Sequence, residues 1–464
     1  MTTDSADLEP QDTGNGEEPV LLRLTDAPHK HRHSLASTLH TLLSTFALFL
    51  HIPCHLIWHY LLVRRSSGVV QEIGRPALHE TAVLLVRHLF LKSYLAPARL
   101  VFALALPSKW VRKVEVAGTK GRWIAKPGTT EEDRKDDELV MLWIHGGGFF
   151  VDTDGACLPF FIQLTKTLNV NRATRFSIFA IDYQLAPEKI YPSQLTEISA
   201  AYHYLVNDLG IPEKRICVGG DSAGGNLAVA FLLHLARPNP QITVPKSLGP
   251  TPGKPGSAFI VSPFINLVSY APSRSSPYDY IDSGGVFHGS LSYIGAVHPY
   301  PPEVAAWLKT ASPSWNPLRW FSGASSAAPE PEGLVKAGLS AGKAEKEGKG
   351  LVLLSSPYVN PNPQVLRDWT WYKEAFPGEG KTLVTWGGKE IFADDVTAFV
   401  EALKDVGVAP TELVKPLGVH DWVLFDSIVP SAAKDKLGGE QAKPDYGIRM
   451  VADFMQARAT DAKE

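Results

Sequence analysis

From about residue 113 onward, short apolar runs along the chain alternate with longer stretches of helical periodicity. Eight of the runs have the length and composition of strands. The predicted strands are 114–116, 122–125, 140–144, 177–181, 216–218, 258–261, 382–386 and 411–415. The predicted helices are 158–168, 194–209, 226–236, 394–404 and 448–457. Strands that alternate with helices indicate an α/β fold with a doubly wound, mostly parallel, eight-stranded sheet.

The rest of the chain divides into segments of different composition. Residues 1–37 are polar and without period, which predicts a disordered tail, and residues 66–112 have amphipathic patterns that predict helices. We expect the main domain to span 113–464, with an insertion over 264–372 that is far longer than a crossover needs. The aromatic first part of this insertion favours a lid over an extension of the core, and 323–350 has the composition of a disordered loop.

Residues 38–65 form a hydrophobic segment ahead of the main domain. Thr38–Val63 holds no acidic residue and no lysine or arginine, and a helix of this length would be about 39 Å long, enough to span a bilayer. Several histidines and Pro53 inside it leave an interfacial helix and a buried helix as alternatives. We expect association with a membrane, with the endoplasmic reticulum as a candidate compartment. Three of the histidines share one helix face, but packing explains them more simply than a metal site does.

Composition narrows the function classes. A chain of 464 residues with 44% hydrophobic residues can bury one large core. The net charge of −3 and the lack of a basic stripe with interleaved aromatic residues argue against a nucleic-acid partner. The three cysteines form neither a disulfide framework nor a metal-binding pair. We therefore expect no cofactor and no metal.

Two glycine-rich motifs follow predicted strands and carry candidate chemistry. Strand 216–218 leads into Gly220-Asp221-Ser222-Ala223-Gly224 and then into a helix, the context that a nucleophile elbow requires. Small neighbours allow the strained backbone that such a serine adopts. Strand 140–144 leads into His145-Gly146-Gly147-Gly148-Phe149, whose backbone N–H groups can point at a developing oxyanion. Together the motifs indicate acyl transfer with Ser222 as nucleophile.

A serine nucleophile needs a base, and the base needs a carboxylate that fixes its tautomer. In elbow-type folds the chain order is serine, acid, histidine. Strand 382–386 leads to Glu390, whereas Asp394 and Asp395 suit the first turn of the next helix. Strand 411–415 leads to His420, which is the predicted base. His145 is better suited to bracing the glycine loop through a hydrogen bond.

This combination of motifs resembles the hormone-sensitive-lipase-like branch of the α/β-hydrolases. The matching residues are His145–Phe149, Asp182–Glu188 with Tyr191-Pro192, Gly220–Asn226, Ser262-Pro263, Glu390–Asp394 and His420. The resemblance implies a serine carboxylesterase whose helical cap is built from the N-terminal region and the insertion.

Carried over to this sequence, the resemblance makes Ser222 the nucleophile, His420 the base and Glu390 the acid. The implied oxyanion donors are the backbone N–H groups of Gly146, Gly147 and Ala223. The sequence departs from the family pattern at three places. Glu390 stands where aspartate is commoner, which leaves Asp394 as an alternative acid. Gln184 replaces the usual arginine and Asp421-Trp422 replace the usual Gly-Phe after the histidine, and these two departures concern structure more than chemistry.

The hydrophobic segment ahead of the catalytic domain also resembles the layout of fungal membrane-bound steryl deacetylases. We expect a lipophilic ester substrate, with a short-chain acyl or acetyl group, and steryl acetate as one candidate. An amidase or formamidase would use the same parts. A non-catalytic receptor with a hydrolase pocket and a membrane-tethered scaffold are the hypotheses from other classes.

Overall fold

The computed structural model describes residues 108–151, 153–186, 188–267, 276, 279, 281, 283–295, 356–363, 368–425, 441, 443 and 445–463. The strands are β1 (Val111–Val116), β2 (Thr119–Ile124), β3 (Leu139–Ile144), β4 (Phe176–Asp182), β5 (Ile216–Asp221), β6 (Ser257–Val261), β7 (Thr382–Gly387) and β8 (Thr411–Lys415). The α-helices are α4 (Asp154–Lys166), α5 (Ser193–His203), α6 (Ser222–Ala236), α7 (Ser283–Tyr293), α11 (Tyr372–Ala375), α12 (Ala393–Asp405), α13 (Trp422–Phe425) and α15 (Tyr446–Asp461). Strands and helices occur where the sequence predicts them, and the predicted α/β fold is confirmed.

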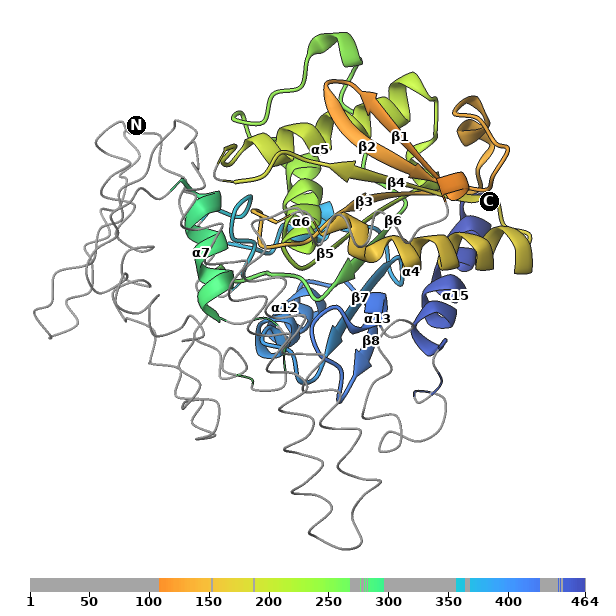
Figure 1. Ribbon diagram of the computed structural model, residues 1–464. Coiled ribbons are helices and arrows are strands. Elements are labelled where there is room, and N and C mark those ends of the chain that lie inside the picture. Colours follow the sequence, from red (N-terminus) through yellow and green to blue (C-terminus); the bar gives the residue numbers. More distant parts are fainter. Residues whose placement is uncertain are drawn as a thin grey trace, which may run out of the picture.

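The eight strands form one sheet in the order β1-β2-β4-β3-β5-β6-β7-β8 (Figure 1). β2 is antiparallel to both of its neighbours, β1 and β4, and the strands from β3 through β8 are parallel to one another. A two-residue turn at Ala117 and Gly118, both with positive φ, closes the β1–β2 hairpin. Such a turn matches the natural twist of paired strands. All the parallel strands therefore present their carboxyl ends at one edge of the sheet.

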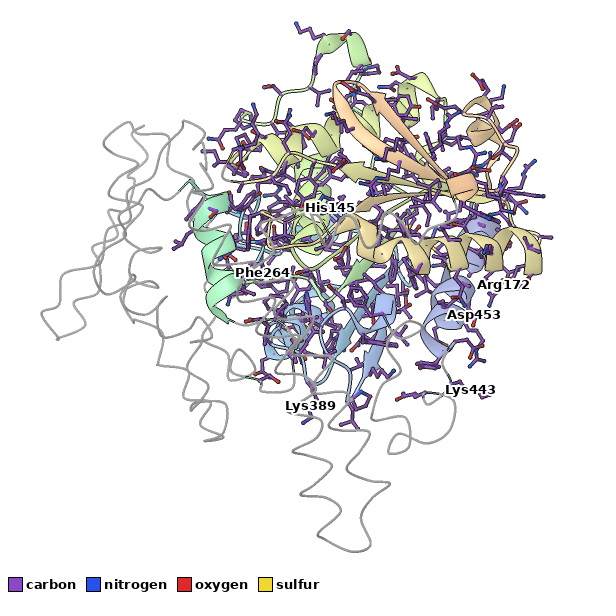
Figure 2. The ribbon with its side chains drawn as sticks, in the orientation of Figure 1. His145, Arg172, Phe264, Lys389, Lys443 and Asp453 are labelled. Atoms are coloured by element: carbon purple, nitrogen blue, oxygen red, sulfur yellow. The ribbon has the colours of Figure 1, made fainter. Side chains whose placement is uncertain are left out.

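Helices cover both faces of the sheet (Figure 1). Residues of α5, α6 and α12 bury their apolar side chains in one core, and those of α4, α13 and α15 form a second core on the opposite face. β3, buried on both sides, sends Leu142 into the first core and Trp143 into the second. Figure 2 shows Arg172 beside Asp453, an ion pair of 2.6 Å that ties the end of the α4 segment to α15.

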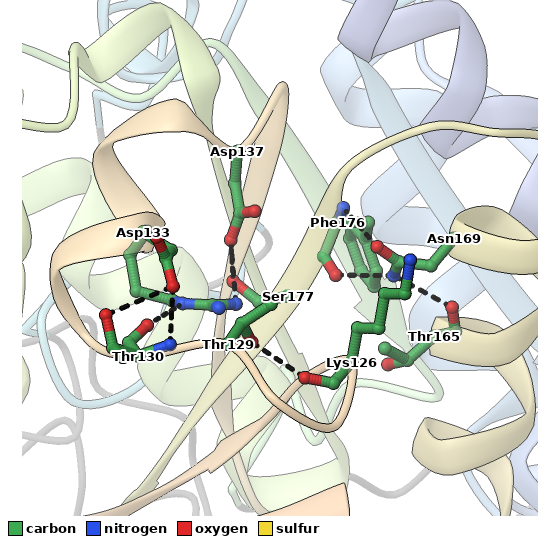
Figure 3. A network of polar contacts seen from close by, with 10 residues as sticks. Lys126, Thr129, Thr130, Asp133, Asp137, Thr165, Asn169, Phe176 and Ser177 are labelled. Carbon is green, nitrogen blue, oxygen red and sulfur yellow. Dashed lines mark hydrogen bonds and ion pairs between the residues drawn. The ribbon is translucent and has the colours of Figure 1, made fainter.

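At the amino ends of β3 and β4 a polar network fixes how these strands start (Figure 3). The buried carboxylate of Asp137 accepts hydrogen bonds from Arg134 at 3.0 Å and from Ser177 at 2.5 Å. The amide of Asn169 bonds to both the N–H and the C=O of Phe176. Hydrogen-bonded buried charges of this kind anchor strand ends. This network lies at the edge opposite to the loops that follow the parallel strands, and we interpret it as structural.

Parts of the predicted layout lie outside the described residues. These are the tail 1–37, the hydrophobic segment 38–65, nearly all of the cap segment 66–112 and the loop 323–350. Within the described ranges, which begin at Ser108, no helix combines the length and the apolar character that crossing a membrane would require. Of the insertion 264–372, helix α7 is described, and its Tyr293 C=O accepts a hydrogen bond from the N–H of Tyr191.

Candidate active site

Ser222 lies at the turn between β5 and α6, where the sequence places the elbow. Its φ is +53°, a left-handed backbone that costs a non-glycine residue free energy. A methyl group on Gly224 would collide with the carbonyl oxygen of Ile144, so α6 can approach β3 this closely only with glycine there. The carbonyl of Ser222 accepts a hydrogen bond of 2.9 Å from the N–H of Phe264. The elbow is thus held between two neighbouring strands.

The loop after β3 runs beside the elbow, and its first residue, His145, is labelled in Figure 2. Contacts of His145 hold the shape of this loop. The His145 ring stacks on Tyr183 with centroids 4.2 Å apart, and its Nδ1 donates to the carbonyl oxygen of Gly146 at 2.7 Å. The Tyr183 hydroxyl donates to the His145 carbonyl at 2.9 Å. The expected bracing role of His145 is therefore what the structure shows. Gly147 and Gly148 both have positive φ, which turns this loop sharply.

The three predicted oxyanion donors differ in their surroundings. The Gly146 N–H donates to Oδ1 of Asp221 at 3.0 Å, so this donor is engaged by the residue before the nucleophile. A methyl group on Gly146 would also meet the side chains of Asp221 and Ser222, which shows how closely the two motifs approach. Gly147 follows in the same loop, and Ala223 is the second residue of α6. Of the three donors, Gly147 and Ala223 are therefore the better candidates.

Glu390 and His420 are both buried and face each other from the loops after β7 and β8. Nδ1 of His420 lies 4.0 Å from Oε1 of Glu390, longer than a hydrogen bond. Catalytic hydrogen bonds are often this long before substrate binds. Asp394, the alternative acid, is exposed in the first turn of α12. The structure therefore brings together the predicted base and the predicted acid.

Ser262, at the end of β6, joins this pair. Its hydroxyl donates to Oε2 of Glu390 at 2.7 Å and accepts from the N–H of Asp421 at 3.0 Å. The N–H of Gly387 also donates to Oε2, at 2.8 Å. Two donors thus fix one oxygen of the Glu390 carboxyl and leave the other towards His420. Ser262 is among the residues that carry the family resemblance, which gave it no role.

The buried setting shifts the pKa values of both groups toward their neutral forms. Burial, and then the carboxylate of Asp279, raise the pKa of Glu390 well above its usual range, while the hydrogen bonds from Gly387 and Ser262 lower it. Burial lowers the pKa of His420 to about 3. A neutral imidazole can accept a proton, and an adjacent carboxylate stabilises the imidazolium that results.

An aromatic row runs from α7 to the base. Tyr293 stacks on Phe149 at 4.0 Å, Phe149 contacts Phe264 at 6.0 Å, and Phe264 stacks on Phe392 at 4.8 Å. The edge of the row meets His420, with the Phe392 and His420 ring centroids 5.0 Å apart. These rings place apolar side chains beside His420. Such surroundings strengthen the electrostatic interactions between the buried groups.

Every group described so far lies at the carboxyl edge of the parallel strands. His145 follows β3, Ser222 follows β5, Ser262 follows β6, Glu390 follows β7 and His420 follows β8. In open α/β sheets this edge is where ligands bind. A serine at an elbow, a glycine loop beside it and a buried histidine–carboxylate pair at this edge define the α/β-hydrolase class.

Comparison with known proteins agrees. Residues 141–281 match a family with the alpha/beta hydrolase fold. The chain is 40% identical to the hormone-sensitive lipase of Mus musculus over 100 residues, which are 21% of this chain and 12% of that protein. It is 28% identical to an esterase of Acinetobacter venetianus over 163 residues, 35% of this chain and 45% of that one. An esterase structure from the bacterial hormone-sensitive lipase family aligns with a TM-score of 0.52 at 19% identity, over 82% of this chain and 98% of that chain.

The chain thus has an α/β-hydrolase fold, and the expected likeness to the hormone-sensitive-lipase-like branch is confirmed. The matched stretches span less than half the length of these two curated relatives.

Proposed function

We propose that this chain is a serine carboxylic ester hydrolase with Ser222 as nucleophile, His420 as base and Glu390 as acid. The observation that carries the proposal is the left-handed backbone of Ser222 at the strand–helix turn. This strain costs about 1–3 kcal/mol, and residues under such strain cluster at active sites. The buried His420–Glu390 pair at the same edge of the sheet supports it. So does the likeness to proteins named esterase and hormone-sensitive lipase.

The reaction would proceed in two steps through an acyl-enzyme. His420 takes the proton of Ser222 while the serine oxygen attacks the ester carbonyl carbon. The oxyanion of the tetrahedral intermediate accepts hydrogen bonds from the N–H groups of Gly147 and Ala223. The alcohol leaves with the proton from His420. Water, deprotonated by His420, then releases the acid, and Glu390 stabilises the imidazolium each time it forms.

The substrate in this proposal is a lipophilic small ester with a short acyl or acetyl group, such as a steryl acetate. The apolar rings that approach His420 support an apolar substrate. The hydrophobic segment 38–65 would hold the enzyme at a membrane, with the endoplasmic reticulum as the candidate compartment. Removing residues 38–65 should move the protein from the membrane fraction to the supernatant. Unchanged membrane association would contradict this part of the proposal.

A fluorophosphonate probe tests the reaction class directly, because it reacts only with an activated serine. We expect labelling of the full chain in detergent and none of Ser222→Ala. Ester hydrolysis by Ser222→Ala at the wild-type rate would refute the assignment. A series of esters of increasing acyl length, with steryl acetate, then identifies the substrate class. Faster turnover of the matching amides would favour an amidase, and no labelling of either protein would favour a receptor or scaffold.

A further inference from the structure

Asp279 is a buried carboxylate that neither the motifs nor the reaction described above uses. It lies in the segment between β6 and α7, inside the insertion. Its Oδ2 accepts a hydrogen bond of 2.7 Å from the N–H of Ile391, and its Oδ1 accepts one of 3.2 Å from the N–H of His420. Ile391 directly follows the acid, and His420 is the base. One planar carboxylate therefore bonds to the backbone on both sides of the catalytic pair.

The two loops also contact each other through backbone hydrogen bonds. Gly388 N–H donates to the Lys415 carbonyl at 2.9 Å, and Lys389 N–H donates to the Gly418 carbonyl at 2.9 Å. These bonds join the parts of the loops that lie nearer to the strands. Asp279 joins the parts that carry the side chains. Hydrogen bonds to a carboxylate are roughly twice as strong as those between neutral groups, so Asp279 is well suited to fixing how the two side chains face each other.

We propose that Asp279 is a positioning residue. It sets the orientation of Glu390 relative to His420 by accepting hydrogen bonds from the backbone N–H groups of Ile391 and His420. This inference rests on the proposed function. Misplacing a catalytic group by about 1 Å can cost on the order of a hundredfold in rate. The pair is separated by 4.0 Å at rest, so its approach in the reaction depends on how the loops are held.

Asp279 also acts on the acid through its charge. Its carboxylate raises the pKa of Glu390, in the same direction as burial. Among the residues that the structure describes here, His420 and Asp421 are also ionisable, and the Asp421 carboxylate approaches the far side of the imidazole ring. Removing the charge of Asp279 should therefore lower the pKa of Glu390. The proposed reaction requires an ionised Glu390. The acid limb of the pH profile of kcat/KM, where activity falls as the pH is lowered, should then move to lower pH.

Three variants separate geometry from charge. Asp279→Asn removes the charge and puts an amide N–H₂ against a backbone N–H, whereas Asp279→Glu keeps the charge and moves the carboxylate by one methylene. Asp137→Asn is the matched control, since Asp137 is also a buried, hydrogen-bonded carboxylate but lies at the opposite edge of the sheet. Rates of ester hydrolysis are normalised to the folded enzyme, and amide hydrogen exchange is followed over 388–395 and 416–423.

We expect Asp279→Asn to lower kcat by about ten- to a hundredfold with little change in KM, to move the acid limb to lower pH and to speed exchange in both peptides. Asp279→Glu should lower kcat and leave the acid limb in place. Asp137→Asn should change neither kcat nor the acid limb. Suppose that the wild type is active and Ser222→Ala is not. If Asp279→Asn then has the same acid limb and the same exchange rates as Asp137→Asn, the inference about Asp279 is wrong while the proposed function stands. Equal hydrolysis by wild type and Ser222→Ala would instead refute the proposed function.

Discussion

Oδ2 of Asp421 lies 3.1 Å from Nε2 of His420, the ring nitrogen opposite to the one that faces Glu390. The imidazole is therefore placed between two carboxyl groups, one on each nitrogen. In a serine triad the nitrogen that does not face the acid is the one that takes the serine proton. In the proposed reaction, the Asp421 carboxylate therefore competes with the Ser222 hydroxyl for this nitrogen.

We therefore expect Asp421→Gly to speed acylation. A net hydrogen bond of about 0.5–1.5 kcal/mol would be removed, which corresponds to about a two- to tenfold faster reaction with a fluorophosphonate. Glycine also suits this position, because φ of Asp421 is +53°. Ala117→Gly is the control: Ala117 has the same φ but lies in the β1–β2 turn. Slower labelling of Asp421→Gly would mean that Asp421 assists the base instead of competing for it.

Removing the Ser262 hydroxyl should make Glu390 harder to ionise. Ser262→Ala takes away one of the two hydrogen bonds to Oε2 of Glu390, and since that bond lowers the pKa of Glu390, its loss should raise this pKa further. Activity would then be lost at a higher pH as the solution is acidified, and kcat/KM would fall by about one to two orders of magnitude.

A pH–rate profile of Ser262→Ala tests this expectation against Ser177→Ala. Ser177 also donates to a buried carboxylate, that of Asp137, but at the other edge of the sheet. Ser177→Ala should lower stability and leave the acid limb where it is. If the two variants have the same acid limb, the Ser262 hydrogen bond does not tune the acid.

Gly224 should tolerate no side chain. A methyl group there would collide with the carbonyl oxygens of Ile144 and His145 and would push α6 away from β3. We expect Gly224→Ala to lower the free energy of unfolding by at least about 2 kcal/mol and to lower fluorophosphonate labelling with it. Gly378→Ala is the control, because a Cβ at Gly378 would meet no atom. Equal denaturation midpoints for the two variants would show that the close approach is dispensable.

His234 should make stability depend on pH. It is buried, and burial, followed by the charge of His203, lowers its pKa to about 4. The unfolded chain therefore binds a proton between about pH 6.5 and 4 that the folded chain does not bind. Stability is fully present above this range and falls as the pH is lowered through it. His420, whose pKa is also lowered, acts in the same direction, and Glu390, whose pKa is raised, acts in the opposite direction.

Melting temperatures of wild type and His234→Asn at pH 7 and pH 5 test this effect. In the wild type, Nδ1 of His234 accepts a hydrogen bond of 3.0 Å from the N–H of Asn239. The side-chain oxygen of an asparagine at position 234 can still accept this bond. The decrease in melting temperature on acidification should be smaller in His234→Asn. An equal decrease in both proteins would assign the acid sensitivity to other groups.

Local patterns were enough to predict the sheet and the two buried residues that face each other as the candidate acid and base, and long-range contacts decided the rest. The eight strands are short apolar runs, and Ser222, Glu390 and His420 each follow one of them in the chain order typical of the fold. Asp279 lies far from any strand in an aromatic stretch, and it acts on backbone N–H groups, which leave no trace in the sequence. The bond from Gly146 to Asp221 likewise joins two motifs that looked independent.

The strand order has a consequence for how the proposed catalytic centre is assembled. The elbow and the glycine loop belong to the chain before residue 268, whereas Glu390 and His420 belong to the chain after residue 367. The two parts meet where β6 pairs with β7, in the register Ala258 to Thr382 through Val261 to Thr385, and also through side-chain contacts such as Ser262 with Glu390 and Arg172 with Asp453. Neither part holds both the proposed nucleophile and the proposed base. Two separately expressed fragments divided within this connection would each lack hydrolytic activity, and hydrolysis recovered after mixing would measure how well the two parts associate.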